Sequence, residues 1–206
     1  MDERDEGLRA RLVAVGVDLV AREGVQALSL REIARRAGVS HGAPRRYFPT
    51  HAALLSAIAR QGFAGLAQEA AAAVAAGDAA DGGAAAAPRA RILALGRVYL
   101  GYAAANRGMF ELMFRHDLLE NAVAGEAPGL RETSLPLFRV LVDLIARVPD
   151  RPGTGSPETV AGALWANLHG IAQLWAWGSL QLASGTDDAD PLLRAALDAY
   201  LGPERP

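Results

Sequence analysis

The sequence feature that most constrains this chain is a segment near its N-terminus, residues 29–48, SLREIARRAGVSHGAPRRYF. Its first half carries apolar residues at helical spacing: Leu30, Ile33, Ala34 and Ala37. This spacing predicts a short helix with one buried face. Ser29 and Glu32 form a capping-box pattern at its start, and Gly38 predicts its end, because glycine enters the left-handed conformation without a Cβ penalty. We therefore expect a helix over about 29–36.

A second helix is expected directly after the turn, over residues 40–47. Ser40 is placed to cap this helix, and Arg45 and Arg46 follow on it. Pro44 fits poorly, because its ring crowds a preceding carbonyl group, so we expect the helix start to shift slightly. Two helices joined in this way form a helix-turn-helix whose arginines point outward.

The turn and the residues after it carry a longer pattern: Gly38-Val39-Ser40-His41-Gly42, then Tyr47-Phe48-Pro49-Thr50, then Leu54-Leu55. In these residues the chain resembles the TetR family of transcriptional regulators. The resemblance covers about the first third of the chain. It implies an all-α fold with an N-terminal three-helix helix-turn-helix domain and a C-terminal helical domain that binds a ligand and dimerises.

The resemblance also implies how such a protein contacts double-stranded DNA. The second helix enters the major groove with its N-terminal residues near base edges. The implied base-edge positions are Ser40, His41, Gly42 and Ala43, with Arg45 and Arg46 one turn later. The implied phosphate contacts are Tyr47, Thr50 and His51, which Ser29 could join through its backbone N–H. The family often has tyrosine where Arg45 or Arg46 stands, and lysine where His51 stands.

Several of these side chains have a purely structural alternative. Phe48 is expected in the core, and Tyr47 is as compatible with the core as with DNA. His41 is equally compatible with solvent, and Arg35 and Arg36 with a solvated surface. The charge distribution favours the DNA interpretation, since residues 22–60 carry seven arginines against two glutamates, a local balance of +5 within a chain of net charge −2.

The rest of the chain also reads as helical. Helices are expected over about 6–23, 50–76, 88–105, 109–114, 133–148, 157–184 and 191–201, with a loop at 117–129. Pro136 would be tolerated only in a first turn. The alanine- and glycine-rich stretch around 70–87 indicates a flexible connection. We therefore expect a DNA-binding domain at 1–66, a helix end and linker at 67–87, and an effector-binding and dimerisation domain at 88–206.

The segment from Thr159 to Thr186 contains no Asp, Glu, Lys or Arg. Its length would suit a membrane span, but scattered polar residues such as Asn167 make that interpretation unfavourable. The alternative is a helix buried by its own domain on one side and by a second copy on the other. The small residues Gly162, Ala166 and Gly170 are compatible with close approach, and TetR-like proteins dimerise through their last two long helices, here about 157–184 and 191–201.

The same segment contains Trp165, His169, Gly170 and Gln173, which resemble a W-H-G type of TetR C-terminal domain. The resemblance predicts a small-molecule site whose polar groups are His169 and Gln173. The predicted apolar and aromatic walls are Tyr102, Phe110, Met113, Phe114, Phe138 and Trp165. The alternative is that His169 is a hydrogen-bonded core or interface histidine.

The composition narrows the remaining function classes. The chain has no cysteine, so thiol chemistry and cysteine-ligated zinc are excluded, and no spacing suggests a metal or cofactor. The N-terminus lacks a signal-peptide layout, so we expect a cytoplasmic protein. Nothing pairs with His169 as a catalytic group, which argues against an enzyme. We expect a homodimeric repressor released from a palindromic operator by a small molecule, or alternatively a regulator with no such ligand, partner-controlled or constitutive.

Overall fold

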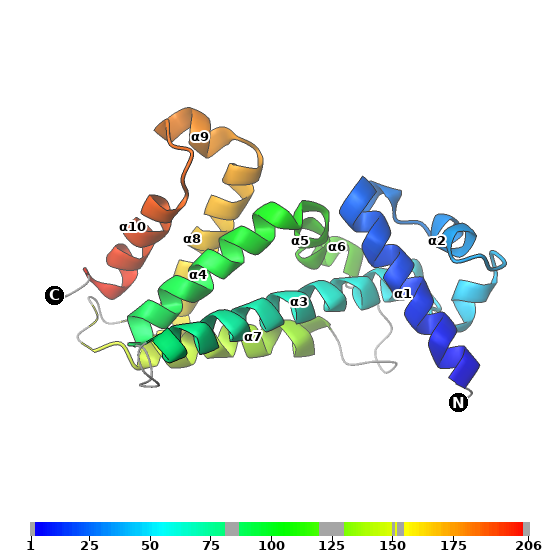
Figure 1. The fold of residues 1–206 in the computed structure, drawn as a ribbon, viewed down its shortest axis with the longest axis horizontal. Coiled ribbons are helices and arrows are strands. Elements are labelled where there is room, and N and C mark those ends of the chain that lie inside the picture. The colour runs from blue at the N-terminus through cyan, green and yellow to red at the C-terminus, as the bar shows by residue number, and fades with distance from the viewer. Residues whose placement is uncertain (1–2, 81–86, 120–129, 150, 152–154, 204–206) are drawn as a thin grey trace. The chain divides into compact units, whose positions relative to one another are not determined.

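The computed structural model describes residues 3–80, 87–119, 130–149, 151 and 155–203 (Figure 1). Within these ranges the regular structure consists of helices, with no strand, so the all-α prediction is confirmed. The chain divides into two compact units. Unit 1 contains Met1–Gly65 and Asn106–Ser134, and unit 2 contains Leu66–Ala105 and Leu135–Pro206.

Unit 1 contains the helix-turn-helix segment. Its elements are α1 (Glu3–Glu23), η1 (Val25–Ala27), α2 (Leu30–Arg36), η2 (Ala43–Arg46), the first half of α3 (His51–Ala80), α5 (Arg107–Met113) and α6 (His116–Leu119). α1 packs against α2, η1 and α5. The fully buried side chains of this unit include Leu12, Leu19, Ile33, Leu54, Ile58, Leu112 and Met113. This core places α2 and η2 at the surface of the unit.

Two glycines allow the helices of unit 1 to approach closely. A Cβ at Gly108, in α5, would overlap the carbonyl oxygen of Val20 in α1. A Cβ at Gly62, in α3, would lie 2.7 Å from the sulfur of Met113. Side chains at these positions would push α5 away from α1 and α3, so the glycines set how tightly this core packs.

Unit 2 is built around three helices that pack pairwise, α4 (Pro88–Ala105), α8 (Pro157–Ala176) and α10 (Asp190–Leu201). The second half of α3, α7 (Leu130–Ala146) from Leu135 onward and α9 (Ser179–Ser184) complete it. Its buried side chains include Ile92, Ile145, Leu164, Leu168, Leu193 and Leu197. The helices expected over 88–105 and 191–201 are therefore present at almost the predicted bounds.

Ion pairs join α4 to α10 at the surface of unit 2. Asp190 accepts hydrogen bonds from Arg97 at 2.6 Å and from Arg194 at 2.8 Å. These two guanidinium groups hold the pKa of the Asp190 carboxyl well below its usual range. A second pair, Arg89 with Asp198, lies further along the same two helices. Both contacts fix the register of α10 on α4.

The structure corrects three of the sequence expectations for these helices. The helix expected over 157–184 is broken, because Gly178 has φ +76° and separates α8 from α9. Pro136 lies inside α7 rather than in its first turn. Residues 116–119 form α6 instead of a loop, whereas 120–129 lie outside the described residues. The first error arises because alanine, leucine and glutamine on both sides of Gly178 all favour helix.

The two compact units differ from the predicted domain division. The boundary at residues 65 and 66 lies where the sequence places the end of the DNA-binding domain, but residues 106–134 group with unit 1 instead of with the C-terminal part. The linker expected at 67–87 is helical as far as Ala80.

In the part of the chain that the structure describes, no helix combines the length and apolar character that a membrane crossing requires.

Candidate functional site

The helix-turn-helix begins with α2, whose two ends match the sequence pattern. The hydroxyl oxygen of Ser29 accepts a hydrogen bond of 3.2 Å from the backbone N–H of Glu32. Gly38 has φ +68°, and the backbone N–H groups of Gly38 and Val39 donate to the carbonyls of Arg35 and Ala34. This is the Schellman arrangement, in which a glycine in the left-handed region satisfies the last carbonyls of a helix. The end at Gly38 and the Ser29 half of the capping box are therefore confirmed, whereas the Glu32 carboxylate binds Arg35 and Arg36 rather than the N–H of Ser29.

The second helix of the motif differs from the prediction. Instead of an α-helix over 40–47, the structure has a single 3₁₀ turn, η2, over Ala43–Arg46, and Ser40 contributes its carbonyl rather than a side-chain cap. The physical reason is Pro44, which has no N–H to donate to the carbonyl four residues earlier. The carbonyl of Ser40 accepts from Ala43 instead, at 3.0 Å, and this three-residue spacing defines a 3₁₀ turn.

Most of the ten residues predicted to contact DNA are exposed. Seven are exposed: Ser29, Ser40, His41, Gly42, Arg45, Arg46 and His51. Ala43, Tyr47 and Thr50 are partly buried. Beneath them Pro44 is buried and Phe48 is only 2% exposed, so Phe48 belongs to the core as expected. Because Pro44 and Phe48 turn inward, the exposed side chains of Arg45 and Arg46 point to solvent.

Arg45 and Arg46 have no ion-pair partner among the described residues, and neither has Arg31 on α2. Their guanidinium groups are therefore available to an anion outside the chain. Gly42 precedes them with φ −83°, and a Cβ there would meet no atom within 4 Å. The fold therefore does not require glycine at this position. The missing side chain leaves room for a molecule outside the chain to approach the backbone of Gly42. Arginine forks bind phosphate or guanine in a bidentate manner.

Thr50 combines a structural role with its predicted phosphate contact. Its hydroxyl oxygen accepts a hydrogen bond of 3.0 Å from the N–H of Ala53 and so caps α3. The hydroxyl proton remains able to donate to an oxygen outside the chain. His51 follows as the first residue of α3, and its side chain is exposed.

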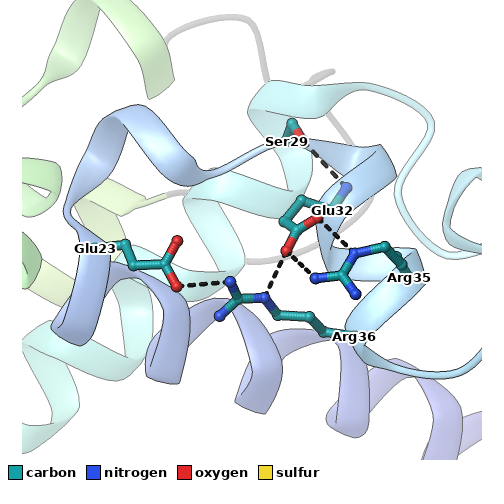
Figure 2. Close-up of polar contacts among 5 residues, drawn as sticks. All are labelled: Glu23, Ser29, Glu32, Arg35 and Arg36. Atoms are coloured by element: carbon teal, nitrogen blue, oxygen red, sulfur yellow. Dashed lines mark hydrogen bonds and ion pairs between the residues drawn. The ribbon is translucent and has the colours of Figure 1, made fainter.

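Arg35 and Arg36, by contrast, are held within the unit by two carboxylates (Figure 2). The Glu32 carboxylate accepts from Nε and Nη2 of Arg35, at 2.9 and 2.6 Å, and from Nε of Arg36, at 2.6 Å. Arg36 also donates to Glu23 of α1 at 2.6 Å. Hydrogen bonds from the two arginines lower the pKa of Glu32 to about 2, so this network stays fully ionised near neutral pH.

The residues predicted to bind a small molecule are divided between the two units. Phe110, Met113 and Phe114 lie in unit 1, at α5 and its end. The rings of Phe110 and Phe114 are 5.0 Å apart, and Phe63 of α3 meets Phe114 at 5.6 Å in an edge-to-face arrangement. Met113 is fully buried. In unit 1 these side chains pack as core.

The remaining predicted residues, Tyr102, Phe138, Trp165, His169 and Gln173, lie in unit 2. Tyr102 is buried. The ring of Trp165 is 6.4 Å from Phe138 and 6.0 Å from His169. The side-chain nitrogen of Gln173 lies 3.5 Å from Nε2 of His169. The structure therefore brings Phe138, Trp165, His169 and Gln173 into one cluster.

Tyr99 of α4 is a member of this cluster that the sequence reasoning missed. Its hydroxyl lies 2.8 Å from Nδ1 of His169, and it accepts a hydrogen bond of 3.2 Å from Nε1 of Trp165. No spacing within α4 reveals this contact, because its partners are on α8. The sequence offered one signal for this contact: the ring nitrogens of Trp165 and His169 on α8 require hydrogen-bond partners when they are buried.

Hydrogen bonds and burial together determine the charge of His169. An indole N–H can only donate, so the Tyr99 oxygen accepts from Trp165. The Tyr99 hydroxyl lies at Nδ1 of His169 and the side-chain nitrogen of Gln173 lies at Nε2, and a neutral imidazole offers one donor and one acceptor nitrogen to such a pair. Burial lowers the pKa of His169 and raises the pKa of Tyr99. The cluster is therefore neutral near pH 7.

Neither the helix-turn-helix nor the cluster around His169 brings metal-ligating side chains together in the described part of the chain. Among the residues that the structure describes, no three His, Asp or Glu side chains gather closely enough to hold an ion. The cluster around His169 instead offers aromatic rings and uncharged hydrogen-bonding groups, which suit an uncharged organic molecule.

Two protein-family models match the chain. The model described as "Bacterial regulatory proteins, tetR family" matches residues 12–58, which include the complete helix-turn-helix. The model described as "Tetracyclin repressor-like, C-terminal domain" matches residues 92–200, more than half of the chain. A comparison with the curated proteins finds no match.

Solved structures resemble the chain over nearly its whole length. A protein with unknown function from Rhodococcus sp. RHA1 is 32% identical, with 94% of this chain and 93% of that chain covered and a TM-score of 0.73. The multidrug binding protein EbrR, complexed with imidazole, is 26% identical, with 100% and 98% covered and a TM-score of 0.63. A TetR family member from Streptomyces coelicolor A3, SCO1917, is 27% identical, with 92% and 97% covered and a TM-score of 0.57.

Proposed function

Because the chain belongs to the TetR family of bacterial transcriptional regulators, we propose that it represses transcription from a palindromic operator and is released by a small molecule. The protein is a DNA-binding regulator and not an enzyme. The observation that carries the proposal is the exposed run from Ser40 to Arg46, whose two arginines have no ion-pair partner among the described residues. In this proposal residues 1–66 contain the DNA-binding surface and residues 88–206 contain the effector-binding and dimerisation surfaces, although residues 106–134 group with unit 1.

The operator is palindromic because the protein acts as a homodimer. Several large apolar side chains of α8 and the residues after it are exposed, among them Trp177 at 71% and Leu182 at 90%. A Cβ at Gly162 or Gly170 of α8 would meet no atom of the described residues within 4 Å, so the packing of these residues does not explain the two glycines. Exposed apolar surface of this kind is typical of an interface, and a second copy that covers α8 and α10 accounts for it.

A dimer places two helix-turn-helix motifs on one duplex. Half-sites about 34–36 Å apart, one turn of DNA, are expected for such a pair. His41, Gly42 and Ala43 are proposed at base edges, together with Ser40. Arg45 and Arg46 contact guanine or phosphate, and Ser29, Tyr47, Thr50 and His51 bind the flanking phosphates. The regulator acts where its DNA is, in the cytoplasm.

The proposed effector is an uncharged aromatic or heteroaromatic molecule. Support comes from the neutral cluster of Tyr99, Trp165, His169 and Gln173 with Phe138 beside it. The related protein EbrR is described as multidrug binding and was solved with imidazole. The effector works only through unequal affinity for the DNA-bound and free states. Reversing a 99:1 preference requires about 5.5 kcal/mol of such difference.

A regulator without any small-molecule ligand is the second candidate. It is favoured by Phe110 and Met113, which are 4% and 0% exposed and pack as ordinary core side chains. The experiment that separates the two uses a reporter gene behind a promoter fragment that the protein binds. Repression that is relieved by an aromatic compound, and no longer relieved in His169→Ala, supports the effector. Repression that no compound from a broad aromatic library relieves supports the second candidate.

A further inference from the structure

The charges of the helix-turn-helix fall into two groups that the DNA-binding function does not explain. Arg31, Arg45 and Arg46 have no carboxylate partner among the described residues, whereas Arg35 and Arg36 on the same small motif are each held by carboxylates. Arg35 remains exposed, with a side-chain exposure of 64%. The Arg35 guanidinium group is therefore exposed to solvent, but its charge is already paired with the Glu32 carboxylate.

The carboxylates occupy the edge of each guanidinium group that would bind phosphate. Arg35 directs both Nε and Nη2 to Glu32, and Arg36 directs Nε to Glu32 and Nη2 to Glu23 (Figure 2). The Nε–Nη2 edge is the fork that makes two parallel hydrogen bonds to a carboxylate or a phosphate. A DNA phosphate can use this edge of Arg35 only by displacing Glu32, and that of Arg36 only by displacing Glu32 and Glu23.

We propose that Glu32 is a specificity-determining residue: by holding Arg35 and Arg36, it withholds two cations from DNA phosphates and so limits binding to DNA of unrelated sequence. The first helix of such a motif crosses the DNA backbone, so arginines of α2 lie where phosphates pass. Affinity for non-operator DNA comes almost entirely from neutralised phosphates. Each arginine withheld therefore lowers non-specific affinity without removing any base contact.

Glu32 has two separable roles, which makes the inference testable. Its backbone N–H donates to Ser29 and caps α2, and this contact does not involve its carboxylate. The substitution Glu32→Gln therefore leaves the cap in place and removes one of the two carboxylates that hold the arginines, whereas Arg36 keeps its hydrogen bond to Glu23. Glu69→Gln is the matched control, because it changes the net charge equally but lies outside the helix-turn-helix, in α3 within unit 2.

The experiment measures binding of the full-length protein to a fluorescent duplex of mixed sequence between about 50 and 200 mM salt. Each released arginine should steepen the slope of log K against log salt by about 0.9, which corresponds to about a three-fold larger loss of affinity over this range. We expect Glu32→Gln to steepen the slope by about one to two and to bind more tightly at low salt. Wild type and Glu69→Gln should share one slope.

Two further variants complete a double-mutant cycle, and the single variant Arg35→Gln remains informative if Glu32→Gln folds poorly. Arg35→Gln alone should leave the wild-type slope unchanged, since Glu32 already holds Arg35. In the Glu32→Gln background the same substitution should reduce the slope by about 0.9. The proposal is overturned if folded Glu32→Gln, verified by circular dichroism, has the wild-type slope, if Glu69→Gln steepens it equally, or if Arg35→Gln alone lowers it.

Discussion

The hydroxyl group of Tyr99 lies 2.8 Å from Nδ1 of His169, and the two residues are 70 positions apart in the chain. This part-buried contact joins α4 to α8 within unit 2. Together with the bond from Trp165 to Tyr99, it makes His169 a neutral, hydrogen-bonded residue at the centre of the predicted effector site. The two interpretations of His169, core residue and ligand contact, are therefore compatible, because a ligand could replace one of these bonds.

Tyr99→Phe should destabilise the protein, because it removes the hydrogen bonds of the Tyr99 hydroxyl to Nδ1 of His169 and to the indole N–H of Trp165. Removing one member of such a part-buried hydrogen-bonded group costs about 1–3 kcal/mol. The free energy of unfolding in urea measures this cost. Tyr200→Phe is the matched control, since Tyr200 is a partly buried tyrosine on α10 of the same unit, and it should change stability by less than about 0.5 kcal/mol. Equal effects of the two variants would contradict the assigned network.

The dependence of the free energy of unfolding on pH should reflect the protonation of His169. Burial lowers the folded-state pKa of His169 from its ordinary value of 6.5, so the unfolded state binds the proton more tightly. The free energy of unfolding should therefore be highest above about pH 6.5 and fall as the pH drops towards the lower folded-state pKa. Urea unfolding at several pH values between about 7.5 and 5 measures this loss.

His169→Asn is the comparison that identifies the residue responsible. In this variant the loss of stability between about pH 7.5 and 5 should be smaller than in the wild type, because the group that binds the proton is absent. The carboxyl of Glu32, whose pKa is lowered to about 2, contributes only at more acidic pH. An identical pH profile in both proteins would show that His169 does not titrate differently on folding.

Gly38 and Gly42 should separate the fold of the motif from its contact with DNA. Gly38→Ala places an alanine at φ +68°, which costs about 1–2 kcal/mol and lowers the melting temperature. Gly42→Ala has φ −83° and open space around the new Cβ, so stability should be unchanged or slightly raised. Its affinity for the operator should nevertheless fall if the backbone approaches the groove there. Unchanged operator binding by Gly42→Ala would remove Gly42 from the proposed interface.

Gly108→Ala should be strongly destabilising, because the new Cβ would overlap the carbonyl oxygen of Val20 in α1. Backbone atoms cannot rotate away, so α5 must shift, at a cost of about 1–3 kcal/mol or more. Gly101→Ala is the control within a helix, since its Cβ would meet nothing within 4 Å, and it should stabilise the protein by about 0.5–1 kcal/mol. Thermal unfolding monitored by circular dichroism checks both. A harmless Gly108→Ala would contradict the close packing of α1 and α5.

The local features of this fold were readable from the sequence. The cap at Ser29, the left-handed Gly38 and the start of α4 at Pro88 each depend on one residue type at one position. Such features follow from backbone chemistry within a few residues. The family resemblance added proposed DNA contacts for residues on η2, which periodicity alone does not provide.

The features that were missed depend on competition between residues. The preference of residues 40–47 for an α-helix was outweighed by the missing N–H of Pro44. The long apolar pattern over residues 157–184 predicted one continuous helix, whereas Gly178 separates α8 from α9. The partnership of Tyr99 with His169 is a tertiary contact between two helices, and single-sequence spacing contains no information about which helices meet.

The most direct test of the central claim is selection of genomic fragments by the purified protein, followed by footprinting at controlled salt. The account predicts a protected palindrome whose half-site centres are about 10 base pairs apart, or a multiple of one helical turn. Arg45→Gln and Arg46→Gln should weaken this protection without unfolding the protein. Salt-sensitive binding with no preferred site, or no binding by a folded and ligand-free protein, would contradict the account.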